Sequence, residues 1–192
     1  MVNTKIKILL AANFVNNFAF SFFQPLFALF VAKLDPNPAM AGIAWSVNMF
    51  VLAVLILIFG KFENKLQHHE KLVVLGYLLM SVGALSYLLV HSIWQLFAVQ
   101  AFNAIGLGMS MPAFRTLFTK AEDKGRITVE WSFADANIRF ATAAGATIGG
   151  LVLKFAGFSA LFTLIAAIEL MSAGIAMSLL NQPEPQRAEA AA

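Results

Sequence analysis

Long intervals without a charged residue are the first pattern along this chain. No Asp, Glu, Lys or Arg occurs between Lys7 and Lys33, or between Asp35 and Lys61. A helix that crosses a membrane needs about 20 mostly apolar residues, so each interval predicts one span. The third interval, from Leu72 to Phe114, is too long for one helix and is interrupted by Val-His-Ser-Ile-Trp, so it predicts a hairpin of two spans. The four spans cover about 8–32, 42–61, 72–90 and 95–115.

Two further apolar stretches carry charges inside them. They cover about 129–153, with Asp135 and Arg139, and about 158–180, with Glu169. The six helices together predict an all-α transmembrane domain over residues 1–181, followed by a polar cytoplasmic tail over 182–192. The chain is 60% hydrophobic and only 12% charged, whereas about a quarter of the residues in a soluble domain are charged. We therefore expect an integral, multi-pass protein in a lipid bilayer.

The basic residues orient the predicted helices, because short cytoplasmic loops are enriched in Lys and Arg. With a cytoplasmic N-terminus, ten basic residues fall on the inner side, while only Lys33 and Lys154 fall on the outer side. The ten are Lys5, Lys7, Lys61, Lys65, Lys71, Arg115, Lys120, Lys124, Arg126 and Arg187. Both termini are therefore predicted to be cytoplasmic, in the plasma or inner membrane. The net charge of +3 belongs to loops at an anionic leaflet, and no nucleic-acid partner is expected.

Several other classes of protein are excluded by what the sequence lacks. The first apolar run is longer than the apolar region of a secretory signal and ends without a convincing cleavage site, so it is interpreted as a retained helix. The chain has no cysteine, and its three histidines lie in predicted loops without metal-ligand spacing. No Gly-x-Ser-x-Gly, His-Glu-x-x-His or paired-aspartate motif occurs. We expect no metal, no cofactor and no enzymatic activity.

Polar residues recur on one face of the first predicted helix and on one face of the fourth. In the first, Asn13, Asn17, Ser21 and Gln24 follow spacings of four, four and three, which place them on one side of a helix. The fourth carries Gln100, Asn103 and Ser110, of which Asn103 and Ser110 lie two turns apart on the same face. These side chains either bond neighbouring helices or line a substrate cavity, and the length of the stripe favours a cavity.

The fifth predicted helix has a polar face and a packing face. Asp135 and Arg139 lie one turn apart, so they can form a salt bridge along the helix. The pair is either self-neutralised within the packing or a site that handles substrate or protons, as ionisable groups inside membranes often do. On another side, the small residues Ala141, Gly145 and Gly149 form a ridge that lets two helices approach closely.

Glu169 lies near the middle of the sixth predicted helix. A carboxylate there is expensive unless it finds a partner. Two interpretations remain open, namely a carboxyl that couples transport to protons and a neutral buried acid. Asp135 is the other candidate for proton coupling.

The segment Gly60 to Leu72, Gly-Lys-Phe-Glu-Asn-Lys-Leu-Gln-His-His-Glu-Lys-Leu, resembles the signature loop of the major facilitator superfamily. Gly60 and Lys65 match that motif, while Asn64 stands where the family has Asp. The resemblance implies that Gly60, Asn64 and Lys65 belong to a cytoplasmic loop that gates the inner mouth of the protein.

Two other segments resemble motifs of the same family. Phe102 to Gly108 keeps Gly106 and Gly108 of the fourth-helix motif, with Phe102 in place of an arginine associated with proton coupling. Ala141 to Gly150 is similar to the fifth-helix motif of drug/proton antiporters. It keeps Gly145, Gly149 and Gly150, with Ala141 and Ala146 replacing Gly and Pro. The resemblance implies that these glycines serve helix packing.

The resemblance covers the whole chain but only the N-terminal six-helix half of a fold that has two halves around a central cavity. It implies that spans one and four line the cavity, with Asn13, Asn17, Gln24, Asn103, Asp135 and Arg139 as cavity residues. It also implies that spans two and five, with the ridge of Ala141, Gly145 and Gly149, meet a second half. That half is either a second copy of the chain or a C-terminal half.

The function expected from this resemblance is transport of a small molecule by alternating access, in the direction of efflux, with a lipophilic substrate as one option. The alternative is a half that does not transport by itself, either a regulatory membrane partner or an inactive fragment. The sequence leaves open the substrate, the oligomeric state and whether transport is coupled to protons.

Overall fold

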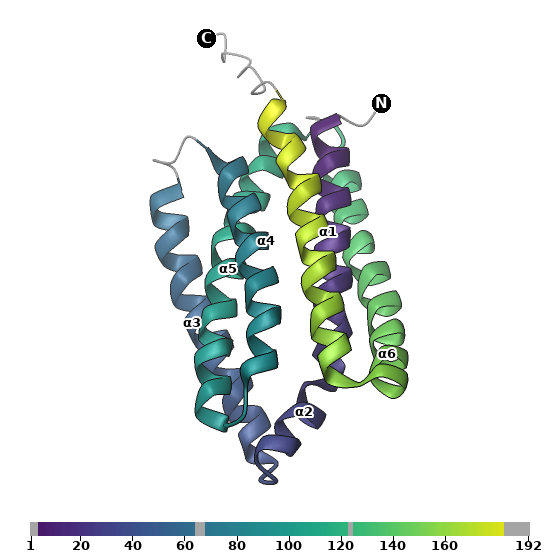
Figure 1. The fold of residues 1–192 in the computed structure, drawn as a ribbon. Helices are drawn as coiled ribbons and strands as arrows, with labels where there is room; N and C mark the ends of the chain where they lie inside the picture. The colour runs from purple at the N-terminus through teal and green to yellow at the C-terminus, as the bar shows by residue number, and fades with distance from the viewer. Residues whose placement is uncertain (1–3, 64–67, 123–124, 183–192) are drawn as a thin grey trace.

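The computed structural model describes residues 4–63, 68–122 and 125–182, which form helices and turns with no strand among them. The elements run in the order α1 (Thr4–Phe23), η1 (Gln24–Leu26), α2 (Phe27–Leu34), α3 (Ala39–Glu63), α4 (His69–Ser86), η2 (Tyr87–Leu89), α5 (Ile93–Ala121), α6 (Ile127–Met177) and η3 (Ser178–Asn181). The helices stand roughly side by side as a bundle, and α1 begins at the same end of the bundle at which η3 ends (Figure 1).

Five segments of the described chain are long and apolar enough to cross a membrane. The first runs from Thr4 to Leu34 and contains α1, η1 and α2. A continuous helix is predicted there from the sequence, but the structure interrupts it with a 3-10 turn at Gln24–Leu26. Pro25 explains the interruption, because proline has no N–H to donate and its ring clashes with the preceding turn of an α-helix.

The last of these segments, Ile127–Asn181, contains a reversal of the chain. At Gly157 the backbone leaves the helical region, with φ of +78°, a value that glycine adopts without the strain of a Cβ. The two arms of α6, residues 127–156 and 158–177, run in opposite directions, and α1 packs against both of them (Figure 1). Without the reversal, the 51 residues of α6 would form a helix about 77 Å long, well beyond the ~30 Å of a bilayer core.

The helices form two groups that meet through α4 (Figure 1). In one group α1 packs on α6, and in the other α5 packs on α3 and α4. Ser81 of α4 donates a hydrogen bond to the carbonyl of Ala166 in the second arm of α6, at 2.8 Å, and so joins the groups. By contrast, α1 makes only sparse contact with α5. Two pockets lined by residues of both helices mark a cleft between α1 and α5.

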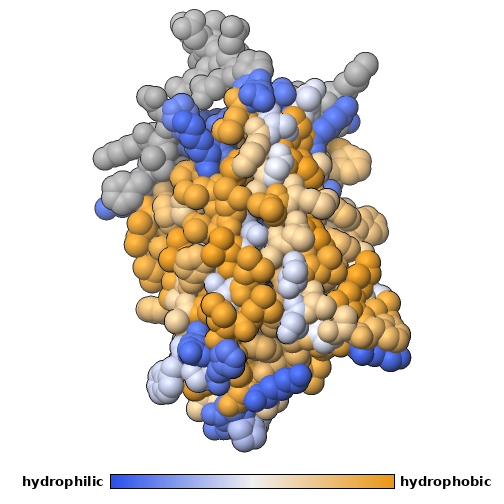
Figure 2. Space-filling model, viewed as in Figure 1, coloured by the Kyte–Doolittle hydropathy of each residue, from blue (hydrophilic) through white to orange (hydrophobic). Residues whose placement is uncertain are grey.

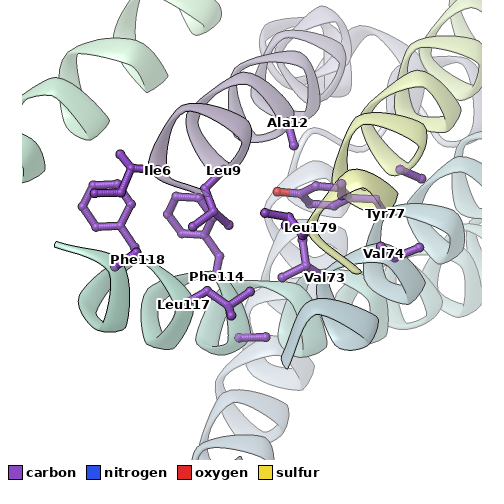
Figure 3. Packing of buried hydrophobic residues seen from close by; sticks show 14 of the residues in the cluster. Ile6, Leu9, Ala12, Val73, Val74, Tyr77, Phe114, Leu117, Phe118 and Leu179 are labelled. Carbon is purple, nitrogen blue, oxygen red and sulfur yellow. The ribbon is translucent and has the colours of Figure 1, made fainter. Parts of the chain in front are cut away.

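One buried apolar cluster closes this cleft near the start of α1. Figure 3 shows Ile6 and Leu9 of α1 against the rings of Phe118 and Phe114 of α5. The hydroxyl of Tyr77 points from α4 towards α1 in the same view. A second cluster lies around Phe23 and other rings towards the opposite ends of these helices. The cleft thus lies between two apolar clusters.

Small residues set the closest helix contacts, which corrects part of the sequence interpretation. Cβ atoms at Gly145 and Gly149 would collide with the backbone carbonyl oxygens of Phe18 and Phe22. Ala141, which is also buried, completes the ridge. The prediction that the ridge meets a second half is wrong, because α1 of the same chain already covers it.

The remaining glycines of the predicted packing set divide into two kinds. A methyl group on Gly106 would lie 2.8 Å from the carbonyl oxygen of Gly76, and one on Gly108 would lie 2.8 Å from Cβ of Leu55. These two glycines let α5 approach α4 and α3. Gly150 has no atom within 4 Å of its added Cβ, so it makes no close helix contact within the described chain.

The central part of the bundle surface is hydrophobic, as expected for a protein surrounded by lipid. Hydrophobic residues cover the central part of the face in Figure 2, and hydrophilic residues gather at its two ends. Large apolar side chains project outward from α3, such as Phe50 and Leu57, and from the first arm of α6, such as Phe140 and Phe155. Such exposed apolar area is typical of helices that face lipid or another membrane helix.

Candidate functional site

Two pockets lie along the cleft between α1 and α5. The first, which we call the aromatic pocket, has a volume of about 60 Å³. Its lining consists of Phe20, Phe23, Gln24, Phe27, Trp45, Asn48, Met80, Ala84, Tyr87, Gln100, Asn103, Phe162, Ile165 and Glu169. The second, which we call the polar pocket, has a volume of about 160 Å³. Its lining consists of Asn13, Asn16, Asn17, Tyr77, Leu107, Ser110, Met111, Phe114, Arg115, Trp131, Ala134, Asp135 and Ile138.

Rings from five elements of the chain build the aromatic pocket. Tyr87 of η2 stacks on Phe162 of α6, with ring centroids 4.8 Å apart and planes 12° apart. Phe23 of α1 meets both rings edge-on, at 5.0 and 4.9 Å, and Phe27 meets Trp45 of α3 edge-on at 5.7 Å. Aromatic pairs favour these stacked and edge-to-face arrangements. The ring positions are therefore fixed by one another.

Carboxamides and one carboxyl supply the polar groups of the aromatic pocket. The hydroxyl of Tyr87 donates to Oε1 of Gln100 at 2.8 Å, and Nδ2 of Asn48 donates to the backbone carbonyl of Gln100 at 2.8 Å. Within the described residues, Oδ1 of Asn48 and Nε2 of Gln100 make no hydrogen bond. No Lys or Arg is present in the described lining. The pocket therefore offers a ligand both a donor and an acceptor among apolar rings, but no positive charge.

Glu169 lies where the two pockets meet. Its side chain is 1% exposed, and its Oε2 accepts a hydrogen bond of 2.7 Å from Nδ2 of Asn16. The same amide group lies 3.5 Å from the sulfur of Met80. Asn16 lines the polar pocket, while Glu169 and Met80 line the aromatic pocket. In the described structure Oε1 of Glu169 makes no hydrogen bond, so one carboxyl oxygen stays available.

The polar pocket combines amides with charges of both signs. Nδ2 of Asn17 donates to the backbone carbonyl of Asn13 at 2.8 Å and to its Oδ1 at 3.0 Å. Arg115 of α5 and Asp135 of α6 line the same pocket, and both are exposed. These two side chains form no salt bridge with each other. Their charges therefore remain available for a ligand.

The residues predicted to line a cavity fall into three sets. Asn13, Asn17 and Asp135 line the polar pocket, and Gln24 and Asn103 line the aromatic pocket. Arg139 is exposed and lines neither of them. Ser21, expected on the same face as the asparagines, is buried instead and lies near Gly145 of α6.

The predicted salt bridge between Asp135 and Arg139 is wrong. Both side chains are exposed, and the salt bridge found among the described residues joins Lys5 to Glu70. An ion pair one turn apart on a helix gains only about 0.2–0.5 kcal/mol, which is too little to hold a long arginine side chain in one place. Of the proposed gating loop, Gly60 lies within helix α3, whereas Asn64 and Lys65 lie outside the described residues.

Several residues of the cleft were not identified from the sequence. Trp45, Tyr87 and Phe162 form much of the aromatic pocket, but aromatic residues in membrane helices also face lipid, so their sequence positions carry little signal. Asn48 gave a usable signal, because it is a lone amide inside a charge-free span. The partner of Glu169 was present in the sequence as Asn16, next to the predicted polar stripe.

Comparisons with known proteins place the chain in a family. A model described as Major Facilitator Superfamily matches residues 9–192. The riboflavin transporter RibZ of Clostridioides difficile (strain 630) is 26% identical over 154 residues, a match that covers 75% of this chain and 32% of that transporter. The crystal structure of the POT family transporter PepTSo aligns with a TM-score of 0.76 and 14% identity, over 97% of this chain and 40% of that one. The chain thus spans less than half the length of either protein, and the second likeness concerns the fold alone.

Proposed function

Because the chain belongs to the Major Facilitator Superfamily, we propose that it is one six-helix half of a transporter that moves a small molecule by alternating access. The observation that carries this proposal is the cleft between α1 and α5, which holds amides, a buried carboxyl and aromatic rings inside an otherwise apolar bundle. Polar groups inside a membrane cost free energy unless they line a substrate pathway or bind a polar partner. In a transporter these groups would line the substrate pathway.

In the proposed topology the two arms of α6 cross the membrane separately. The chain then has six crossings with both ends on the cytoplasmic side, which agrees with the distribution of Lys and Arg. The natural chain has no cysteine, so single cysteines report topology directly. Cysteines placed at Lys33 and Lys154 should react with an impermeant thiol reagent from outside intact cells. Cysteines at Lys71 and Asn181 should react only after permeabilisation, and labelling of Asn181→Cys in intact cells would mean that α6 crosses once.

A second six-helix unit is proposed to complete the substrate path. The two pockets, of about 60 and 160 Å³, are each smaller than the ~300 Å³ at which small-molecule sites begin. A unit facing the cleft would enclose the remaining volume. It is either a second copy of this chain or a further segment corresponding to the part of the relatives that the chain does not cover.

The substrate is proposed to be a small, partly aromatic molecule moved outward. Rings in the aromatic pocket suit a flat or lipophilic group, and the relative RibZ is named for riboflavin. The outward direction rests on the resemblance of residues 141–150 to the motif of drug/proton antiporters. Glu169 and Asp135 are the carboxyls of the cleft, and we assign proton coupling to them.

Transport in vesicles that contain only this chain tests the proposal. The protein would be reconstituted, and movement of riboflavin would be measured with and without a pH gradient, together with the oligomeric state of the same preparation. We expect transport that the gradient accelerates, from an assembly larger than one chain. Glu169→Gln should lose the response to the gradient, while Gly150→Ala, which alters a residue without close neighbours, should keep it. Binding of riboflavin without any transport would instead support a partner half that does not transport alone.

A further inference from the structure

We propose that the cleft recognises one amphipathic molecule in two parts, with a flat aromatic head in the aromatic pocket and an uncharged, hydroxyl-rich tail in the polar pocket. The inference deepens the proposed function, because it names the class of substrate and its orientation. It rests on the different chemistry of the two pockets and on their connection through Asn16 and Glu169.

The aromatic pocket matches a head group with hydrogen-bonding edges. Its rings come from α1, α2, α3, η2 and α6, so a flat group would contact them on several sides. Oε1 of Glu169, Oδ1 of Asn48 and Nε2 of Gln100 make no hydrogen bond within the described residues. A purely hydrocarbon head would leave these groups unsatisfied, at a cost in free energy. A heterocycle with ring nitrogens and carbonyl groups would satisfy them.

The polar pocket matches a tail of hydroxyl groups. Its asparagines offer both donors and acceptors, Asp135 offers acceptors, and Arg115 offers donors. A hydroxyl group can both donate and accept, so a chain of hydroxyls can bond to every kind of group in this lining. Because Arg115 and Asp135 carry opposite charges, the pocket as a whole does not favour a charged tail of either sign.

The dimensions require a ligand that extends over both pockets. Asn13 lines the polar pocket and Phe23 lines the aromatic pocket, and ten residues of α-helix separate them by about 15 Å. That length suits a three-ring heterocycle that carries a chain of several carbons, with one edge of the ring system inside the aromatic pocket of about 60 Å³ and the rest of it in the cleft. The hydrogen bond between Asn16 and Glu169 lies at the junction, where the head would meet the tail.

Riboflavin and lumiflavin provide the test, because they share the ring system and differ in the tail. Lumiflavin carries a methyl group in place of the ribityl chain. Aromatic side chains quench flavin fluorescence on stacking, so binding to the purified chain in detergent can be followed without transport. We expect saturable quenching by both, with a Kd for riboflavin about tenfold lower or better, as the loss of one or two hydrogen bonds would predict.

Matched variants separate the two parts of the site. Asp135→Ala should weaken riboflavin binding about tenfold while changing lumiflavin binding little. Arg139→Ala, on the same helix but outside both pockets, should change neither. Trp45→Leu should weaken both ligands by a similar factor, whereas Trp94→Leu should have no effect, because Trp94 is 75% exposed and lies outside the lining.

Three outcomes would overturn the proposal of a two-part site. They are equal affinity for riboflavin and lumiflavin, an equal effect of Asp135→Ala on both ligands, and an absence of saturable quenching. Transport is measured separately in vesicles. The expected binding pattern without transport would support a half that does not transport alone and leave the two-part site standing, while transport of riboflavin without the pattern would overturn the two-part site and leave the proposed function standing.

Discussion

The ammonium of Lys5 lies 2.8 Å from Oε1 of Glu70, in a salt bridge that joins the first turn of α1 to the first turn of α4. Only 5% of the side chain of Lys5 and 12% of that of Glu70 are exposed. The two helices belong to the two different groups of the bundle. This ion pair therefore ties the groups together at one end of the cleft.

Removing Lys5 should destabilise the protein far more than removing the exposed Lys7. Lys5→Ala leaves the carboxylate of Glu70 largely buried without its cation, and breaking a buried pair in this way costs about 3 kcal/mol or more. Lys7→Ala should cost less than about 0.5 kcal/mol, as is usual on a surface. Thermal unfolding in detergent would measure both.

The double variant Lys5→Leu with Glu70→Leu tests whether the loss of stability comes from an unpaired buried charge. It removes both charged groups, and a protein often keeps its stability when both partners of a buried ion pair are replaced by apolar residues. We expect it to unfold at a higher temperature than Lys5→Ala. Equal stability of Lys5→Ala and Lys7→Ala would contradict a stabilising role for the salt bridge.

The hydrogen bond between Asn16 and Glu169 gives a second stability prediction. Glu169→Leu removes the oxygen acceptor of Nδ2 of Asn16 and leaves that group only the weak bond of 3.5 Å to the sulfur of Met80, so the loss costs about 1–3 kcal/mol. Glu169→Gln keeps an oxygen that can accept, so its unfolding temperature should stay close to that of the natural chain. If the Leu and Gln variants unfold together, the hydrogen bond contributes nothing measurable to the fold.

Neighbouring glycines allow a test of the packing between α1 and α6. A Cβ at position 149 would meet the backbone of Phe22, while one at position 150 meets nothing within 4 Å. Gly149→Ala should therefore destabilise the bundle by about 1–3 kcal/mol. Gly150→Ala should be neutral or gain up to about 1 kcal/mol, because alanine favours a helix. The two variants make the same substitution at adjacent helix positions, so similar unfolding temperatures would contradict the close approach.

The sequence predicts the helices better than it predicts which helices pack against each other. The charge-free intervals predict membrane helices because nearly every residue of a spanning helix has to be apolar. The partner of a small-residue ridge, in contrast, depends on tertiary packing. Gly145 and Gly149 show that a close contact is needed, but only the structure shows that Phe18 and Phe22 of the same chain supply it.

The site shows the same division. Asn13 and Asn17 were found through helical spacing, a local property that the sequence carries. Lys5 was assigned to a cytoplasmic loop by its position, whereas the structure pairs it with Glu70, 65 positions away in sequence. Contacts of this kind have no local signal, since nothing near Lys5 specifies which acid it will meet. The aromatic pocket was missed for the same reason.

Exchanging Asp135 and Arg139 tests whether the cleft senses charge at one defined position. In the structure these residues do not pair with each other, and only position 135 lines the polar pocket. The double variant Asp135→Arg with Arg139→Asp keeps the net charge and the composition of the helix, so we expect it to insert and unfold like the natural chain. The exchange places a second cation in the pocket, where Arg115 repels it. It also removes the carboxylate that could accept hydrogen bonds from the tail of a ligand. Transport of riboflavin in vesicles should therefore fall by about tenfold or more. The single variant Arg139→Gln, which changes no residue of the pocket, should retain most of the activity. A correctly inserted exchange variant with full transport would show that position 135 has no role in the substrate path.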